Sequence, residues 1–337
     1  VKAIDGSSVQ LPDTPDNQLK YPQPPGQKAG CGFPVMQLSA LIDLRHGGWQ
    51  HVTTSPQSVH DHGLVGRMLP HLQRGEVLTA DRAYSSYEMM ARMSQKGCWL
   101  VSRLHQARKV DWRKGRRIGL DQRIVRWTRP SQPAGSGLSQ EEWTGLPKKL
   151  DARLIRVRAI GRDGKPRRLI LVTNLLDSKR YPARQIEELY CQRWQIELRL
   201  RDLKTTMGME MLRTKTPEMA RKELCMFLIA YNAMRLLMLR AGALLGRSSE
   251  QLSFKGTLQV VRAWRREFSG LHNAPRRRAE VNAELLFQIA ARIRLPRPGR
   301  HEPRAVKRRP KSYQYLTKPR HEFQEIQHRS SYRKNRR

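Results

Sequence analysis

The chain has 337 residues, of which 65 are lysine or arginine and 29 are aspartate or glutamate, so its formal net charge is +36. Apolar residues make up 38%, which provides for a core and argues against a wholly disordered chain. A small-molecule enzyme gains nothing from such self-repulsion, whereas a polyanionic partner offsets it and releases counterions. Nucleic acid is favoured over an anionic membrane, because the sequence has no lipidation motif and no basic helix beside a membrane span.

The cysteines and the apolar segments indicate a cytoplasmic protein. The four cysteines lie far apart without a CxxC pair, which favours reduced thiols over a zinc site or a disulfide framework. The apolar run 224–239 contains Asn232 and Arg235. It is too short to span a bilayer, and it predicts a buried helix. No signal peptide is expected, because position 1 already lies in a strand-like segment.

The first candidate acid follows the first predicted strand. Val1–Ile4 is a short hydrophobic segment that ends at Asp5 and Gly6. An acid followed by glycine is also typical of a turn, which is the simpler interpretation of Asp5 taken alone. The proline-rich residues 12–26 predict an irregular loop.

A β-hairpin is predicted next, with strands over Pro34–Leu44 and Trp49–Thr54 joined by a tight turn. Asp43 is a further acid in this region. It lies before the hairpin turn and not beside a long open loop, so it ranks below Asp5 as a catalytic candidate.

The second candidate acid lies in an alternation of helices and strands. The pattern predicts a helix over 58–72, a strand over Glu76–Ala80, a helix over Ser86–Lys96 and a strand over Cys98–Leu104. Asp81 directly follows the strand Glu76–Ala80 and thus repeats the position of Asp5. In α/β proteins ligands bind beyond the carboxyl ends of the strands. The pattern therefore predicts an α/β fold with two acids at neighbouring strand ends.

Residues 106–176 differ in character from the segments on either side. They are rich in glycine, proline and arginine, and they include strand-like segments over Arg153–Ile160 and Arg168–Asn174. We interpret them as a β-rich insertion that interrupts the α/β core. Cations around Trp112 and Trp127 suit a surface that follows a nucleic-acid backbone and stacks on bases. The alternative is a solvated sheet face with two partly buried tryptophans.

The third candidate acid lies on an amphipathic helix predicted over Tyr181–Lys204. At about 100° per residue, Tyr190, Arg193, Glu197 and Lys204 share one arc at the edge of its apolar stripe. A carboxylate between two cations suits metal and phosphate. The alternative is a solvated face with i,i+4 pairs such as Arg193–Glu197.

The remaining chain predicts further helices and then a tail dense in proline and arginine from residue 296 onward. Such a composition cannot bury a core. We expect the tail to be extended or disordered until it meets DNA, the alternative being a merely solubilising tail.

Three segments carry a resemblance to a known family: AIDGSSVQLPDTPDN, TADRAYSSY and LYCQRWQIELRLRDLK. They resemble the catalytic regions of the insertion-sequence DDE transposases called the insertion sequence four family. The family signature, Tyr-x2-Arg-x3-Glu-x6-Lys, is met by Tyr190, Arg193, Glu197 and Lys204. The resemblance covers nearly the whole chain. It implies an RNase H-like (retroviral integrase-like) catalytic core interrupted by a β-rich insertion, followed by a helical region and a basic tail.

The resemblance also implies a division of the chain. Residues 1–105 would be the first part of the core, 106–176 the insertion, 177–270 the second part of the core with following helices, and 271–337 the basic C-terminal region.

The resemblance, together with the chemistry of the side chains, assigns roles to seven residues. Asp5, Asp81 and Glu197 take the places of the metal-binding acids and would hold two Mg²⁺ ions, with Mn²⁺ able to substitute. Arg193 and Lys204 would hold flanking phosphates, Tyr190 would contact a phosphate or sugar, and Trp194 would stack on a base or pack under the insertion. The implied function is cleavage at insertion-sequence ends and strand transfer into target DNA, by a homodimer on double-stranded DNA in the nucleoid.

Family members carry an N-terminal region before the first catalytic strand, whereas this sequence begins at that strand. An alternative function is therefore a truncated, catalytically inactive DNA-binding remnant that interferes with a full-length transposase. A structure-specific nuclease would explain the acids, although not the Tyr-Arg-Glu-Lys helix or the insertion.

Overall fold

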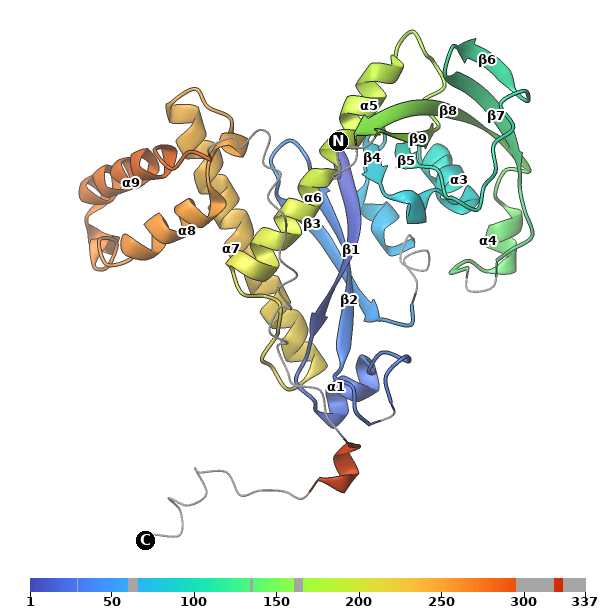
Figure 1. Cartoon of the computed structure of the whole chain (residues 1–337). Helices are drawn as coiled ribbons and strands as arrows, with labels where there is room; N and C mark the ends of the chain where they lie inside the picture. The colour runs from blue at the N-terminus through green and yellow to red at the C-terminus, as the bar shows by residue number, and fades with distance from the viewer. Residues whose placement is uncertain (29, 60–65, 134–135, 161–165, 295–317, 324–337) are drawn as a thin grey trace.

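The computed structural model describes residues 1–337 except 29, 60–65, 134–135, 161–165, 295–317 and 324–337. Its centre is one nine-stranded sheet with the order β3-β2-β1-β4-β5-β9-β8-β7-β6 (Figure 1). The strands are β1 (Lys2–Gln10), β2 (Val35–Asp43), β3 (Trp49–Pro56), β4 (Val77–Ala80), β5 (Trp99–Arg103), β6 (Arg116–Gly119), β7 (Gln122–Thr128), β8 (Lys149–Ile160) and β9 (Pro166–Thr173). β1, β4 and β5 are parallel neighbours, and the other described pairs are antiparallel.

Helices cover both faces of the sheet. The α-helices are α1 (Pro15–Lys20), α3 (Tyr87–Gln95), α4 (Gln140–Thr144), α5 (Ala183–Gln192), α6 (Trp194–Arg201), α7 (Pro217–Leu244), α8 (Phe254–Ala263) and α9 (Pro275–Ala290). Single turns are η1 (Leu69–His71), η2 (Arg82–Tyr84), η3 (Asp202–Thr206, π-helical), η4 (Ser249–Gln251), η5 (Leu271–Asn273) and η6 (Arg320–Glu322). α8 and α9 extend away from the sheet together with the end of α7 (Figure 1).

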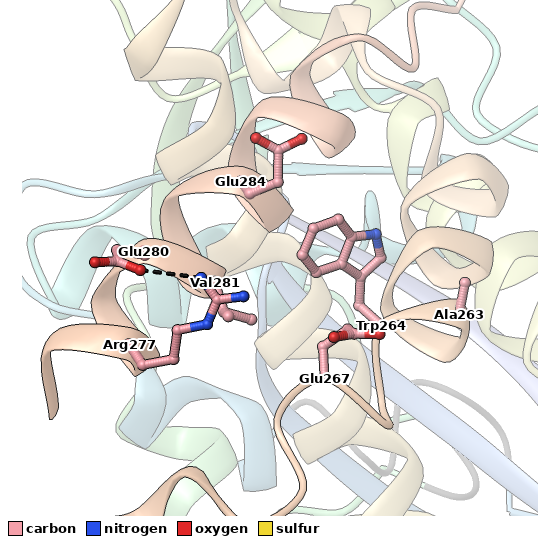
Figure 2. A pocket seen from close by; sticks show the side chains of 7 residues that line it. All are labelled: Ala263, Trp264, Glu267, Arg277, Glu280, Val281 and Glu284. Carbon is pink, nitrogen blue, oxygen red and sulfur yellow. Dashed lines mark hydrogen bonds and ion pairs between the residues drawn. The ribbon is translucent and has the colours of Figure 1, made fainter. Parts of the chain in front are cut away.

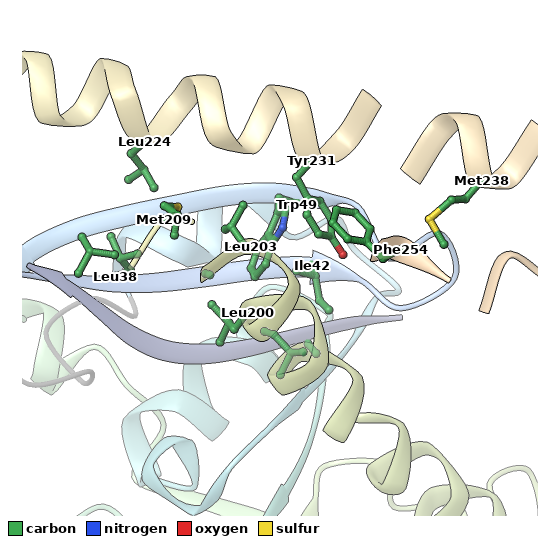
Figure 3. Packing of buried hydrophobic residues seen from close by; sticks show 14 of the residues in the cluster. Leu38, Ile42, Trp49, Leu200, Leu203, Met209, Leu224, Tyr231, Met238 and Phe254 are labelled. Atoms are coloured by element: carbon green, nitrogen blue, oxygen red, sulfur yellow. The ribbon is translucent and has the colours of Figure 1, made fainter. Parts of the chain in front are cut away.

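The largest core cluster lies between the sheet and the helices α6 and α7. Leu38 and Ile42 of β2 pack there with Leu200 of α6 and with Leu224 and Tyr231 of α7 (Figure 3). A second cluster on the opposite face joins α3 to β4 and β5, and a third joins α5 to β5, β8 and β9. The α5–α6 segment is therefore held against the sheet along its whole length.

The first predicted strand is longer than expected, and the predicted turn at Asp5 and Gly6 is wrong. β1 continues to Gln10, so both residues lie within it, because β2 supplies an antiparallel partner along its full length. Tertiary pairing here overrides the local turn tendency of glycine. The loop over 12–26 also contains a short helix, α1, with Pro15 in its first turn and Thr14 as its N-cap.

The predicted single helix over Tyr181–Lys204 is divided. α5 ends at Gln192, Arg193 lies in a tighter turn whose N–H bonds to Tyr190, and α6 begins at Trp194. The last turn, η3, is π-helical. Because a π-turn changes the helical phase, the regular arc predicted for Lys204 does not hold.

The helix predicted over the apolar run 224–239 is present, with Leu224 and Tyr231 buried, but it is longer and less buried than predicted. It belongs to α7, which has 28 residues and is long and apolar enough to cross a membrane by length and composition. Core helices pass the same test. Only 28% of its tested window is buried, and Met226 and Ile229 are exposed. Asn232 bonds to Trp49 and Arg235 pairs with Glu250, so its polar residues hold neighbouring elements.

The β-rich segment 106–176 contains β6, β7, β8 and β9, which extend the core sheet because β9 pairs with β5. The turn between β8 and β9 (161–165), part of the helix predicted over 58–72, and almost all of the tail lie outside the described residues.

Candidate active site

Two of the three predicted acids lie side by side on neighbouring parallel strands. In the β1–β4 pair, Ala3 lies opposite Thr79. Two residues further along each strand, the same register brings Asp5 level with Asp81, about 5 Å away across the sheet. β4 ends just before Asp81, whose carboxylate accepts the N–H of Ala83 and caps η2. The register thus places Asp81 beside Asp5 where β4 ends, and the charge of Asp81 acts on the Asp5 carboxyl.

Glu197 reaches the same place from α6 through Arg193. The Arg193 guanidinium lies 3.0 Å from the Glu197 carboxylate and 3.5 Å from that of Asp5. It thus bridges one acid of the sheet and the acid of the helix. The structure brings Asp5, Asp81, Arg193 and Glu197 together, although they come from three separate parts of the sequence.

Asp5 is the most perturbed of these acids. The pKa of Asp5 is raised to about 6, mainly because the carboxyl is buried; the Gly6 N–H and Arg193 oppose the rise, and the negative charges of Asp81 and Glu197 add to it. An acid that is costly to ionise and has two acidic neighbours is typical of a site that attracts cations.

Tyr190 and Trp194 flank this cluster. The Arg193 guanidinium lies 5.9 Å from the centre of the Tyr190 ring, and burial raises the pKa of the Tyr190 hydroxyl. Trp194 is 41% exposed, at the first position of α6. Tyr190 therefore belongs to the half-buried wall of the cluster, and Trp194 to its rim.

Lys204 lies further along and binds β1. Its ammonium donates to the Ser8 carbonyl at 2.8 Å and lies 3.4 Å from the Ser7 hydroxyl. The π-turn that contains Lys204 thus joins the helical segment to the strand of Asp5. This contact was not predicted, because the sequence alone did not extend the first strand beyond Asp5 and Gly6.

Arg103 is a cation that the sequence analysis missed. Ala80 pairs with Ser102, so Asp81 and Arg103 are level on neighbouring strands and Arg103 continues the row of Asp5 and Asp81. The positive charge of Arg103 lowers the pKa of Tyr190. The sequence could have indicated Arg103 as a site residue, because it lies at the end of β5 as Asp81 lies after the end of β4.

The donor set of this cluster fits a divalent cation such as Mg²⁺, because carboxylate oxygens are its preferred protein ligands. Among the residues that the structure describes, no three His, Cys, Asp or Glu side chains are grouped closely enough to hold an ion as they stand. The reason at Asp5 and Glu197 is that Arg193 is bound to both carboxylates. Ion binding there requires Arg193 to move.

The two tryptophans of the β-rich segment are covered by arginines. The Arg108 guanidinium lies 3.9 Å from the centre of the Trp127 ring, and the Arg156 guanidinium lies 4.0 Å from that of Trp112. Trp127 is only 7% exposed. The structure therefore supports a packed Trp127 and not one that is free to stack on a base.

A buried ion network, also absent from the sequence analysis, holds α6 in place. Glu250 of η4 pairs with Arg199 of α6 and with Arg235 of α7, and Arg235 also donates to the His46 carbonyl. The two arginine side chains are 6% and 2% exposed. Because Arg199 lies two residues after Glu197, the network positions the helix that carries the third acid.

A pocket of about 480 Å³ between α8 and α9 has a different charge (Figure 2). Its wall includes Glu267, Glu280 and Glu284 beside Trp264, and Glu280 pairs with Arg277 at 3.0 Å. These carboxylates make it an unsuitable surface for a polyanion.

Comparisons with known proteins agree with the motif. The model of the family described as "Transposase DDE domain" matches residues 1–233. The transposase InsG for insertion sequence element IS4 of Escherichia coli K12 is 28% identical over 327 residues, which cover 94% of this chain and 69% of InsG. The putative transposase InsZ of the same organism is 28% identical over 103 residues, 29% of this chain and 34% of InsZ.

Among solved structures, the piggyBac transposase synaptic complex with hairpin DNA is similar at 10% identity, with a TM-score of 0.46 and coverage of 84% of this chain and 57% of that one. That likeness is too distant to support an argument. The family model spans most of the chain, and the resemblance inferred from Tyr190, Arg193, Glu197 and Lys204 is thereby confirmed: the chain belongs to the DDE transposases and is related in sequence to the IS4 transposase.

Proposed function

We propose that the chain catalyses metal-dependent cleavage at insertion-sequence ends and strand transfer into target DNA. The observation that supports this most is that Asp5 and Glu197, from a strand and a helix, share Arg193, while the charge of Asp81 on the neighbouring strand acts on Asp5. The net charge of +36 supports DNA, and not a membrane, as the partner. A homodimer on DNA in the nucleoid is part of this proposal.

We infer an RNase H-like core for the first five strands, as the family resemblance implies. Their order β3-β2-β1-β4-β5, with β2 alone antiparallel to the other four, supports it.

Asp5, Asp81 and Glu197 would hold two Mg²⁺ ions, which when bound activate a nucleophilic oxygen and stabilise the leaving oxygen of an in-line displacement at phosphorus. In that displacement the attacking oxygen forms a bond to phosphorus and the bond to the 3′-oxygen breaks. Water as nucleophile gives cleavage, and a 3′-hydroxyl gives strand transfer. The same residues therefore serve both reactions.

The cations of the site would position the DNA strand. Arg193 would exchange its two carboxylate partners for a phosphate, where its planar fork suits bidentate binding. Arg103 and Lys204 would add positive charge on either side, with Lys204 also fixing β1. Tyr190 and Trp194 would contact sugar or base at the rim.

The test is nicking of DNA that carries the element's ends, on blunt and on hairpin substrates, with Mg²⁺ or Mn²⁺. We expect the wild type to nick, and Asp81→Ala and Glu197→Ala to lose nicking while they keep DNA binding. Glu188→Gln is the matched control, because Glu188 is an exposed acid on α5 paired only with Arg184 in the described contacts. Equal nicking by wild type and Glu197→Ala would refute the assignment. Binding without nicking by the wild type would favour the inactive DNA-binding alternative.

A further inference from the structure

A second polar groove surrounds the edge strand β3, away from the acids. It has a volume of about 570 Å³ and lies between β3, the end of α1, the segment leading into η1, and α7. Both faces of β3 contribute, since His51 and Thr53 point to one side and Val52 and Thr54 to the other. We call it the β3 groove.

The titratable side chains of the β3 groove are mostly basic, and none of its lining residues is acidic. The basic ones are Lys20, His51, Arg67, His71 and Arg221. The pocket between α8 and α9 has three glutamates, and the cavity beside Asp81 includes Glu88. The hollow at the end of α8 lined by Arg262, Arg265 and Arg266 is also basic. The β3 groove differs from it in combining its cations with two stacked histidines and a buried hydroxyl.

Two histidines at its wall are stacked. The rings of His51 and His71 lie 3.5 Å apart between centroids with an angle of 17° between planes. The His51 ring is 3.1 Å from the Thr53 hydroxyl, and burial together with the neighbouring His71 lowers the pKa of His51. A nearby anion would favour the protonated His51 ring, so an anion would bind at His51 together with a proton.

A buried hydroxyl in the groove has no partner. Ser55 is 3% exposed, and its oxygen makes no hydrogen bond. A buried polar atom without a partner is costly, and a ligand or a water in the groove would satisfy it. By contrast, the adjacent Thr54 hydroxyl is bound to that of Tyr21 at 3.1 Å. The unsatisfied donor therefore lies among the basic side chains.

We propose that the β3 groove binds a backbone phosphate of DNA outside the catalytic site. The proposal rests on the proposed function, which supplies the DNA. Asp5 is level with Ala40, and Ala40 with Val52, so β3 lies two strands, about 10 Å, from the acids, with Val52 on their face of the sheet and the two histidines on the other. This separation lies within the width of one duplex, whose charges are closely spaced. A phosphate held by Arg67, Arg221 and the histidines would fix the register of the DNA without reading its bases.

The first experiment measures the affinity for a short fluorescein-labelled duplex in EDTA as a function of salt. We expect Arg221→Ala and Arg67→Ala each to weaken binding about tenfold and to lower the salt slope by about one. Lys222→Ala is the matched control, because Lys222 is the next residue on α7 and pairs with Glu218. Equal effects of Arg221→Ala and Lys222→Ala would overturn the proposal.

The second experiment follows proton uptake. We expect the duplex to bind more tightly at about pH 6 than at about pH 8, and His51→Gln with His71→Asn to remove most of that difference. The other groups that face the pair are Lys20, Arg67 and Arg221, the Cys225 thiol, and the Lys2–Glu76 ion pair, whose lysine donates to the His71 carbonyl. An unchanged pH difference in the double variant would overturn the proposal.

Inorganic phosphate distinguishes DNA from a free anion. If phosphate shifts the His51 and His71 ring signals in NMR while the arginine variants bind DNA like the wild type, the groove is a free-anion site and the proposal is wrong. The nicking rate at saturating DNA distinguishes a failure of the groove proposal from a failure of the proposed catalytic function. Variants that bind weakly but nick at the wild-type rate support the groove, whereas a wild type that binds without nicking refutes only the catalytic proposal.

Discussion

The Arg193 guanidinium donates a hydrogen bond to the Glu197 carboxylate at 3.0 Å, one turn further along the chain. The same guanidinium lies 3.5 Å from Asp5, so one cation neutralises two of the three candidate ligands. A divalent cation at these carboxylates would have to compete with it.

Replacing Arg193 should therefore raise the affinity for divalent cations. We expect Arg193→Gln to bind Mn²⁺ at least about tenfold more tightly in the absence of DNA, because it removes a positive charge 3–4 Å from the carboxylates. Electron paramagnetic resonance of free Mn²⁺ measures this. Arg184→Gln, which removes an exposed arginine of α5, should leave the affinity unchanged. A weaker affinity in Arg193→Gln would show that the arginine organises the site.

The ionised Asp5 carboxylate should lower the free energy of unfolding of the metal-free protein. Its pKa is raised from 3.8 to about 6, so the ionised form is disfavoured in the fold. The cost is absent below about pH 4, grows between pH 4 and 6, and is complete above that range. We expect Asp5→Asn to raise the free energy of unfolding in EDTA by up to about 3 kcal/mol at neutral pH and by little at pH 4. Urea titrations at the two pH values measure it, and equal effects at both would contradict the assignment.

Removing Glu250 should destabilise the protein strongly. Glu250→Gln leaves the buried Arg199 and Arg235 without their shared carboxylate, which we expect to lower the free energy of unfolding by about 3 kcal/mol. Glu280→Gln removes an exposed i,i+3 partner of Arg277 and should cost less than about 0.5 kcal/mol. Denaturant unfolding of both variants provides the comparison. Similar losses would mean that the network contributes no more than a surface pair.

A substitution at Gly47 would disturb the Glu250 network, because the Gly47 backbone lies against Arg235. Gly47 has a φ of +69°, and a Cβ there would lie 2.7 Å from Nη2 of Arg235, which is held by Glu250 and the His46 carbonyl. Gly75 also has a positive φ, with nothing within 4 Å of such a Cβ. Both Gly→Ala changes carry the backbone strain, so we expect Gly47→Ala to cost about 1 kcal/mol more than Gly75→Ala. Equal thermal shifts would show that Arg235 yields without cost.

Local patterns predicted the elements that local physics controls. The hairpin of β2 and β3, the strand before Asp81 and the helix after Ser86 follow from apolar periodicity and from Ser86 as an N-cap, and the structure contains all of them. The spacing from Tyr190 to Lys204 was enough to identify the family.

Features that depend on distant partners were not predictable. β1 continues through Asp5 and Gly6 because β2 pairs with it, and the helix of Glu197 breaks at Arg193 and widens at η3, where Lys204 bonds to Ser8. The Glu250 network joins residues 51 and 15 positions apart along the chain, which no periodicity reveals. The roles of Asp5, Asp81 and Glu197 remain predictions until the nicking experiment is done.

The pairing of β5 with β9 connects the outer strands of the sheet mechanically to the strands of the candidate site. β5 carries Arg103 and lies directly beside the strand that precedes Asp81, while its other edge is hydrogen-bonded to the strands that extend to β6. β5 and β9 are paired over three residue pairs, from Val101 opposite Thr173 to Arg103 opposite Leu171, so the hydrogen-bonded sheet is continuous across the joint between them. Twisting of the far end of the sheet would thus be transmitted to the carboxylates as a tilt of β4 against β1.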